Sequence, residues 1–121
     1  MSKRRVVVTG LGIVSPVGNT VSAAWENIIS GKSGITRITR FDASNFASQI
    51  AGEVKDFDIQ QYLSVKEARR MDIFIHYGMA AAIQAIKDAG IEDVTHFDSE
   101  RIGVNIGSGI GGLPMIENTD T

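Results

Sequence analysis

Residues 6–20 read VVVTGLGIVSPVGNT, and the fold prediction depends on the pattern in this stretch. Three β-branched residues run into a Gly-x-Gly turn, and the turn leads toward the start of a helix. A strand, a glycine turn and a helix in this order begin the fingerprint of a dinucleotide-binding loop. Glycine at these positions also suits a tight structural turn that binds nothing. The rest of the chain has to decide between these two interpretations.

The first predicted elements are a buried strand over residues 6–9 and a helix that begins after Asn19 or Thr20. A continuous apolar run bounded by glycine is typical of a strand that is covered on both faces. The helix has one apolar face, and Gly31 provides the stop signal at its C-terminus. That face consists of Val21, Ala24, Trp25, Ile28 and Ile29.

The middle of the chain predicts an irregular surface segment over 32–50, a short strand within 51–57 and two helices. Ser64 and Glu67 match a capping box, which predicts that a helix starts there. Residues 72–90 favour a longer helix that ends at Gly90, and its apolar side chains fall on every face. A helix that is apolar all round is typical of the interior of a large protein or of a subunit contact.

The last part predicts a polar connection over 91–100 and a strand over 101–107, which runs into a second glycine loop, GSGIGGL. The order of strand, helix, loop, helix and strand favours an α/β fold with parallel strands. The final residues, LPMIENTDT, stop where an α/β protein would begin its next helix. We therefore expect a truncated chain with an incomplete sheet.

The composition is that of an ordinary globular protein. The 121 residues suffice for one domain with one core. Hydrophobic residues make up 43% and charged residues 21%, which argues against disordered, collagen-like and membrane proteins. The net charge of −2 does not indicate a nucleic-acid partner. No cysteine is present, so these residues contain no disulfide, thiolate metal site or cysteine nucleophile.

Neither glycine loop has the full context of a nucleotide site. Gly10 and Gly12 match the first half of the dinucleotide fingerprint, but Ser15 occupies the place of its third glycine, and no acidic residue lies near position 30. The second loop matches Gly-x-Gly-x-x-Gly, but the chain ends before an acidic position is reached. Neither loop ends in the Gly-Lys-Ser/Thr of a phosphate loop. A structural turn is favoured, and a nicotinamide oxidoreductase is the more distant alternative.

Two histidines and one basic cluster are candidates for chemistry. His76 lies in the apolar helix and His96 in an acidic connection, which favours a core histidine and a solvated one over a metal site. Lys66, Arg69 and Arg70 are spaced i, i+3 and i+4 on one predicted helix face. They form either a solvated surface or a patch that docks an acidic partner.

Several motifs together resemble one family. They are RRVVVTGLGIVSPVGNT, SGKSGI, FD at 41–42, VKDF, KEARRMDIFIHYG and RIGVNIGSGIGGL. This set is similar to the start of the bacterial β-ketoacyl-(acyl carrier protein) synthases, closest to the type II elongating enzyme of fatty acid synthesis. The resemblance covers essentially all of the chain, but only about the first quarter to third of a family member.

The resemblance implies an incomplete thiolase-like α/β fold, layered α/β/α/β/α in the complete protein, in which residues 1–121 are the N-terminal part of the N-terminal half. It implies an acyltransferase that extends an acyl chain by decarboxylative condensation with malonyl carrier protein. The family uses a nucleophilic cysteine and two histidines, and none of these falls on a residue of this chain. We therefore expect no catalytic residue here and no activity from this chain alone.

The resemblance does assign two peripheral sites. Lys66, Arg69 and Arg70 match positions where the family docks its acidic carrier protein. Ile110, with Gly109 and Gly111 beside it, matches the residue that gates the acyl pocket. The implied partners are acyl carrier protein, fatty acyl and malonyl thioesters and a second copy of the chain, in the cytoplasm, with no cofactor, metal, nucleic acid or membrane. The alternative is a noncatalytic module that binds carrier protein or a subunit.

Overall fold

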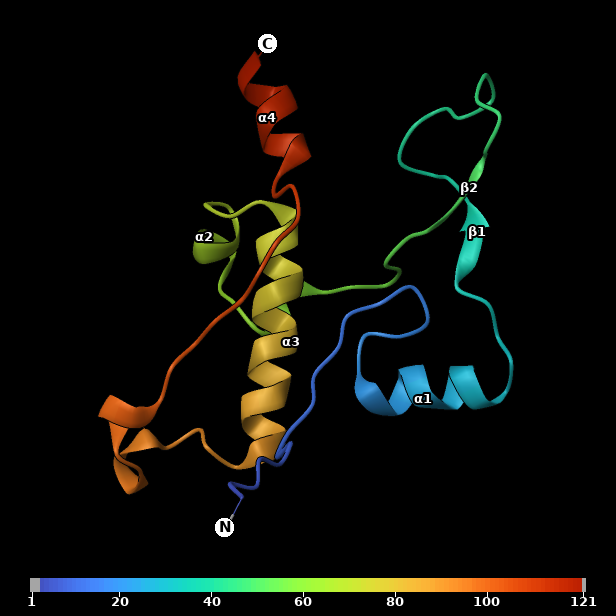
Figure 1. Cartoon of the computed structure of the whole chain (residues 1–121). Helices are drawn as coiled ribbons and strands as arrows, with labels where there is room; N and C mark the ends of the chain where they lie inside the picture. The colour runs from blue at the N-terminus through green and yellow to red at the C-terminus, as the bar shows by residue number, and fades with distance from the viewer. Residues whose placement is uncertain (1–2, 121) are drawn as a thin grey trace.

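A computed structural model describes residues 3–120 of the chain, and its central element is one long helix, α3 (Ile73–Ala89) (Figure 1). Helix α1 (Val21–Ile29) and strands β1 (Ile35–Arg37) and β2 (Ile50–Gly52) lie on one side of it. Helix α2 (Val65–Ala68) lies on the other side. Helix α4 (Leu113–Asp120) follows the second glycine loop. Three short 3-10 turns complete the described elements: η1 (Ile59–Gln61), η2 (Val94–His96) and η3 (Ser99–Arg101).

The helix ends follow the signals in the sequence. The Thr20 hydroxyl accepts a hydrogen bond from the Ala23 amide at 3.2 Å, so Thr20 is the cap of α1. Asp72 caps α3 and accepts from the Ile73 amide at 2.7 Å. Gly90 ends α3 in the left-handed conformation, with φ of 72°, which glycine adopts without steric cost. The predicted helices over 21–29 and 72–90 are confirmed.

The glycines of the first loop lie against α3. A Cβ atom added to Gly12 would overlap the Ala81 carbonyl oxygen, and one on Gly10 would lie 2.6 Å from the Ala89 amide nitrogen. Neither glycine has a positive φ, so what requires glycine here is the close approach of two backbones. The Gln84 side chain adds a polar link, because its Oε1 accepts from the Ile13 amide at 3.2 Å. The structural interpretation of this loop is therefore favoured by its packing.

The sheet differs from the predicted one. Strands β1 and β2 pair antiparallel, with Ile35 opposite Gly52 and Arg37 opposite Ile50. Strand β2 confirms the short strand expected within 51–57, although it covers only the beginning of that range. Strand β1 lies inside the segment 32–50, which was predicted to be irregular. The connection folds back on itself, which brings the two strands together in opposite directions.

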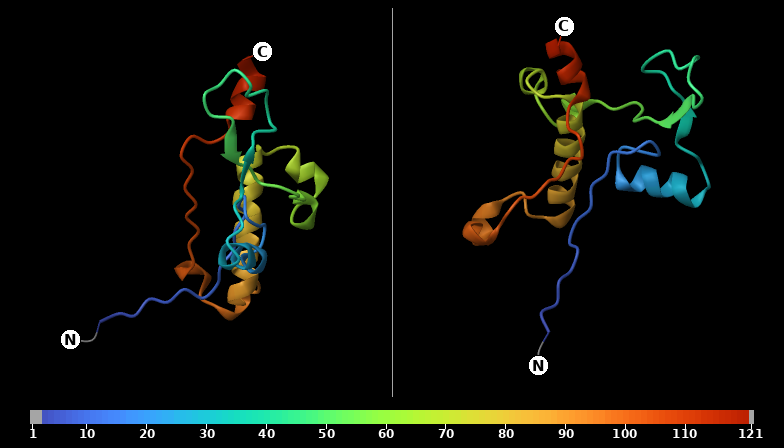
Figure 2. Two further views of the ribbon diagram at one scale, coloured as in Figure 1. Left: turned by 90° about the vertical axis from the view of Figure 1, so that its right-hand side faces the viewer. Right: turned by 45° about the horizontal axis from the view of Figure 1, so that its top comes forward.

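The predicted strands over 6–9 and 101–107 are absent from the described residues, and this part of the prediction is wrong for the structure. Both segments are extended but unpaired, and Arg101 belongs to η3. Val6 is 93% exposed and Val104 is 81% exposed. A strand is defined by its hydrogen-bonded neighbour, and no described strand pairs with either of these segments. In both views of Figure 2 the N-terminal segment projects away from α3.

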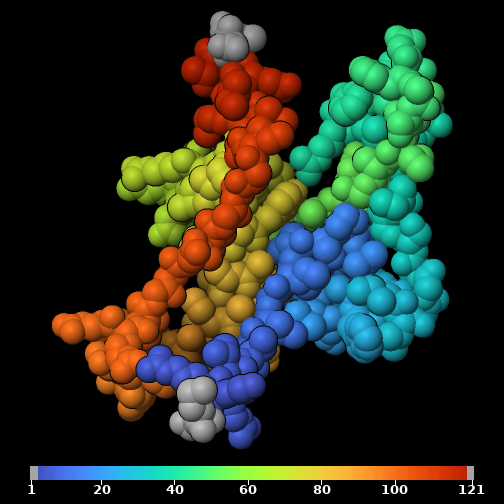
Figure 3. Space-filling model, viewed as in Figure 1, coloured from blue at the N-terminus to red at the C-terminus, as the bar shows by residue number. Residues whose placement is uncertain are grey.

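Few side chains are buried. Those of the described residues with under a tenth of their surface exposed are all alanines: Ala24, Ala43, Ala68 and Ala80. Large apolar side chains such as Trp25, at 60% exposed, remain open to solvent. Figure 3 shows the segment from η3 to α4 crossing the surface of α3, while the β1 and β2 region stands apart from it.

The contact between Gly12 and α3 leads to a stability prediction. Gly12→Ala should lower the free energy of unfolding by about 1–3 kcal/mol, because one backbone has to move away from the other. Gly78→Ala is the matched control, since an added Cβ there meets nothing within 4 Å and alanine favours a helix interior. In urea unfolding, the midpoint concentration should fall for Gly12→Ala and rise for Gly78→Ala. Equal stability of both variants would contradict the packing described for Gly12.

The exposed apolar surface leads to a second prediction. Residues 1–121 alone should self-associate in water, because uncovered apolar side chains and unpaired strand-like segments favour contact with other copies. Light scattering after size-exclusion chromatography should give a mass above that of the monomer. A folded monomer that stays monomeric across a dilution series would contradict this expectation.

Candidate functional site at the N-terminal end of helix α3

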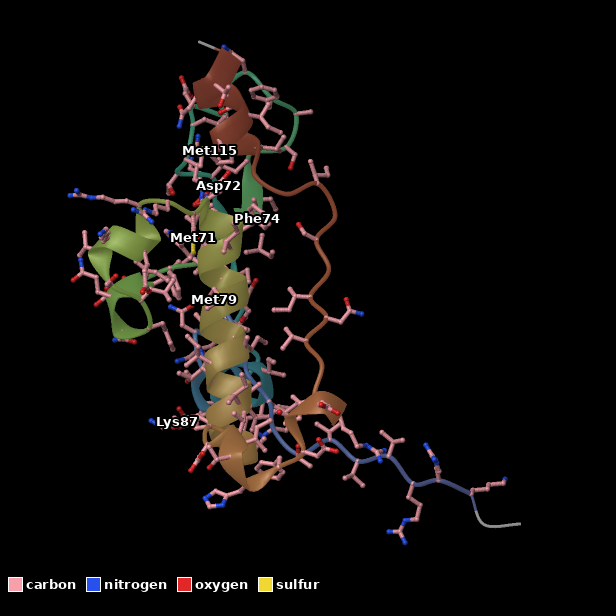
Figure 4. The ribbon with its side chains drawn as sticks, turned by 90° about the vertical axis from the view of Figure 1, so that its left-hand side faces the viewer. Met71, Asp72, Phe74, Met79, Lys87 and Met115 are labelled. Atoms are coloured by element: carbon pink, nitrogen blue, oxygen red, sulfur yellow. The ribbon has the colours of Figure 1, made fainter. Side chains whose placement is uncertain are left out.

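The two peripheral sites predicted from the sequence meet at the same end of α3. The basic residues lie in and directly after α2, and the chain then enters α3 at Asp72. The second glycine loop returns to this end before α4 begins. In Figure 4, Asp72 and Met115 lie close to each other at the start of α3, whereas Lys87 lies toward its other end. Segments distant in sequence are therefore neighbours here.

The basic segment is held by a cap and by one side chain of α3. The Ser64 hydroxyl accepts from the Glu67 amide at 3.2 Å, which confirms the predicted helix start. At the end of α2 the Ala68 carbonyl oxygen lies 2.8 Å from Nε2 of His76, and Ala68 itself is buried. A carbonyl can only accept, so His76 donates from this nitrogen. The predicted core histidine thus fastens α2 to α3.

Lys66, Arg69 and Arg70 are exposed, and none of them forms an ion pair with another side chain that the structure describes. The prediction that all three share one helix face is only partly correct, because α2 ends at Ala68. Arg69 is its C-cap and keeps helical angles, while the Arg70 amide makes a turn bond to the Glu67 carbonyl at 3.1 Å. The three cations remain close in sequence on a short, well-anchored turn and are open to a partner.

The second glycine loop presents Ile110 to solvent. Ile110 is 77% exposed. Gly111 has φ of 80°, a conformation that a side chain would make costly, and a Cβ on Gly109 would meet nothing. The loop therefore has the backbone freedom expected for Gly109 and Gly111. Of these two glycines, Gly111 has a positive φ and Gly109 does not.

An apolar hollow of about 360 Å³ separates this loop from α3. Its α3 wall comes from Phe74, Ile75, Gly78 and Met79, and its other wall from residues 106–108. Gly78 leaves room on this helix face, since an added Cβ there would meet no atom within 4 Å. An apolar lining of this kind suits a hydrocarbon chain better than a charged ligand.

Asp72 is a further residue of this site, beyond those predicted from the sequence. Its Oδ1 accepts from the Ile73 amide, and its Oδ2 accepts from the Met115 amide at 3.1 Å. The first bond could be predicted from the sequence, because an Asp directly before an apolar helix is a favoured cap. The second bond joins residues far apart in the chain and could not be read from local sequence.

The histidines do not form a metal site in the described structure. His96 is exposed and lies 3.2 Å from the Asp93 carboxylate, while His76 is used at the Ala68 carbonyl. Hydrogen bonds from the side chain and backbone of Thr95 lower the pKa of Asp93. Among the side chains that the structure describes, no three of His, Asp or Glu are grouped closely enough to hold a metal ion. The same residues include no helix long and apolar enough to cross a membrane.

Comparisons with known proteins identify the family. Residues 3–121 match the model of the β-ketoacyl synthase N-terminal domain. A 3-oxoacyl-[acyl-carrier-protein] synthase 2 from Vibrio harveyi is 59% identical over 117 residues, which are 97% of this chain and 28% of that protein. A synthase 2 from Synechocystis sp. is 50% identical over 121 residues, covering 100% of this chain and 29% of the relative.

The fold is also similar to that of solved ketosynthases. A type II PKS acyl-carrier protein in complex with its ketosynthase, AntDE:AntF, matches with a TM-score of 0.71 and 32% identity, over 92% of this chain and 29% of that one. The ishigamide ketosynthase/chain length factor matches with a TM-score of 0.64 and 32% identity, over 84% of this chain and 24% of its own. The mixed helices and small sheet agree with part of such an α/β protein. The chain therefore belongs to the β-ketoacyl synthase family, and its residues 3–121 match the model of the family's N-terminal domain.

Proposed function

We propose that this chain is part of a 3-oxoacyl-(acyl carrier protein) synthase that extends fatty acyl chains by two carbons. The observation that carries this proposal is the 59% identity over 117 residues to a protein named 3-oxoacyl-[acyl-carrier-protein] synthase 2. The chain spans 28% of that relative, and its 121 residues include no cysteine. The nucleophile therefore has to come from outside residues 1–121, and the reaction belongs to the complete enzyme.

In this reaction a cysteine thiolate attacks the acyl thioester of one carrier protein and expels that carrier's thiolate, which then takes up a proton from solvent. Loss of CO₂ from malonyl carrier protein then leaves a carbanion, which attacks the enzyme-bound acyl group and expels the thiolate. A low-pKa thiolate serves both steps, because it is a strong nucleophile and an adequate leaving group. Residues 1–121 contribute binding surfaces to this chemistry and none of its reacting atoms.

The layered thiolase-like fold is part of the same proposal, with residues 1–121 as the N-terminal part of its N-terminal half. The exposed, extended segments around Val6–Val8 and Val104–Ile106 support it, since β-branched residues favour strands that have neighbours on both sides. A cytoplasmic homodimer is part of the same proposal, and the apolar surface of α3 is consistent with further chain packing there.

The basic turn at Lys66, Arg69 and Arg70 is our candidate for carrier docking. Its three cations are exposed, lack ion-pair partners among the described residues and stand on a turn held by His76. Local positive charge accelerates the approach of an acidic partner even when the net charge of the chain is −2. One of the similar solved structures is itself a complex of a ketosynthase with an acyl-carrier protein.

The second glycine loop is our candidate for the gate of the acyl pocket. Ile110 stands beside Gly111, whose left-handed backbone lets the loop turn back toward α3. The hollow between α3 and residues 106–108 is apolar, as the binding of a fatty acyl chain requires. Ile110, Gly109 and Gly111 then decide how far this hollow is open.

One observation favours a second candidate function. The absence of cysteine from all 121 residues is also what a noncatalytic module that binds carrier protein or a subunit would show. The two candidates differ in turnover. Such a module would bind carrier protein and leave its thioester intact.

The full-length gene product should convert acyl and malonyl carrier proteins into a 3-oxoacyl carrier protein with release of one CO₂. Residues 1–121 alone should give no product, because the nucleophile is missing. Mass spectrometry of the carrier-bound product distinguishes these outcomes. Binding of acyl carrier protein by the full-length product without any condensation would favour the noncatalytic module instead.

Lys66→Glu should weaken binding of acyl carrier protein by about tenfold at low salt, because it replaces an attraction with a repulsion. Added salt should reduce the difference between variant and parent. Lys32→Glu is the matched control, with the same change of charge at an exposed site just after α1. Isothermal titration should show a loss only for Lys66→Glu. Equal losses for both variants would mean that net charge alone, rather than this turn, controls docking.

A further inference from the structure

The Asp72 carboxylate connects two segments that lie 43 residues apart. One oxygen, Oδ1, accepts from the Ile73 amide at 2.7 Å and caps α3. The other, Oδ2, accepts from the Met115 amide at 3.1 Å, in the first turn of α4. Hydrogen bonds to a charged acceptor are stronger than neutral ones. Asp72 thus holds both helix starts with a single side chain.

Gly112 fits against the same carboxylate. A Cβ atom added at Gly112 would overlap Oδ2 of Asp72, so its backbone passes the carboxylate at a distance that excludes any side chain. The next residue back, Gly111, faces the Phe74 ring, and a Cβ built on it would lie 3.8 Å from that ring. Two consecutive glycines therefore bring the loop down onto the first turn of α3.

The rest of the loop has no comparable tie. Within the described chain, residues 103–111 make no hydrogen bond, and the Ile102 amide makes the last one before the loop, to Ser99. Ile110 is two residues before Gly112 and is 77% exposed. The hydrogen bond from the Met115 amide to Asp72 fixes the backbone that follows Ile110. We infer that this bond determines the position of Ile110.

We propose that Asp72 is a positioning residue that anchors the backbone of residues 112–115 to α3 and thereby sets the position of Ile110 in the loop whose first residues line the apolar hollow. This inference rests on the proposed function only in the role of Ile110 as an acyl gate. The anchor itself is independent of that role. Asp72 acts through the loop and touches no reacting atom.

Asp72→Asn tests the anchor directly. An amide has one acceptor oxygen, so it keeps either the bond from Ile73 or the bond from Met115 and turns a donor toward the other amide. Asp58→Asn is the matched control, because Asp58 caps η1 by accepting from the Gln60 amide at 2.9 Å and bridges to no distant segment. Asp72→Ser is a second variant, since serine is an equally favoured helix cap but has a single, shorter side-chain oxygen.

Hydrogen exchange of the Met115 amide in the full-length gene product is the first measurement. Asp72→Ser should accelerate it by about tenfold or more, Asp72→Asn should accelerate either this amide or the Ile73 amide, and Asp58→Asn should leave both unchanged. In Asp72→Ser the amides of α3 should keep their protection, which separates loss of the anchor from loss of the helix. Unchanged exchange at Met115 in Asp72→Ser, or equal acceleration by Asp58→Asn, would overturn the proposal.

The second measurement is the ratio of kcat/KM for long and short acyl chains. If the Asp72 variants loosen the gate, this ratio should move toward one, by about tenfold where the parent discriminates strongly between chain lengths. The KM for the malonyl carrier protein should stay unchanged. A general loss of stability would lower both values together. Faster exchange with an unchanged ratio would overturn the link to Ile110. If the parent protein condenses nothing while Met115 still responds, the proposed function is wrong and the anchor is supported.

Discussion

The structure depends on the close approach of a glycine backbone to an alanine-rich helix face. Gly10 and Gly12 lie against Ala81, Ala85 and Ala89, where any side chain on either glycine would collide with the main chain of α3. Such contact brings many atoms into van der Waals range and leaves no space for larger groups. Gln84 then adds directional links, because its Nε2 donates to the Asn19 carbonyl at 2.7 Å and to the Tyr62 hydroxyl at 3.0 Å. The parts of the chain before and after the small sheet are thereby assembled on one helix.

The opposite end of α3 carries the features that bear on function. His76 fastens the end of α2, which places the basic turn, and Asp72 fastens the start of α4, which places the second glycine loop. Both side chains come from the cap or first turn of the same helix. Carrier docking and access to an apolar pocket, in the proposed function, are thus organised by one rigid element. Rigid support of this kind is what positions residues on otherwise mobile loops.

The two glycine motifs show why such motifs need structural context. Both follow β-branched residues, and the second matches Gly-x-Gly-x-x-Gly in full. In the first, glycine serves close packing on α3 with ordinary backbone angles. In the second, Gly111 adopts a positive φ and Gly112 passes the Asp72 carboxylate. A negatively charged oxygen beside the second loop is a poor neighbour for a phosphate, so this geometry does not support the nucleotide alternative.

Local signals in the sequence by themselves determined helices α1 and α3 and the start of α2. Thr20, Ser64 and Gly90 act as predicted because capping involves neighbours within a few residues. The family resemblance also selected the basic turn and the Ile110 loop, whose roles remain proposals. Only the tertiary structure decided that these two sites lie at one end of α3, where His76 fastens the first and Asp72 the second. It also decided that β1 and β2 pair antiparallel while residues 6–9 and 101–107 stay unpaired. Strand pairing and distant hydrogen bonds depend on which segments meet in space, and local propensity carries no information about that.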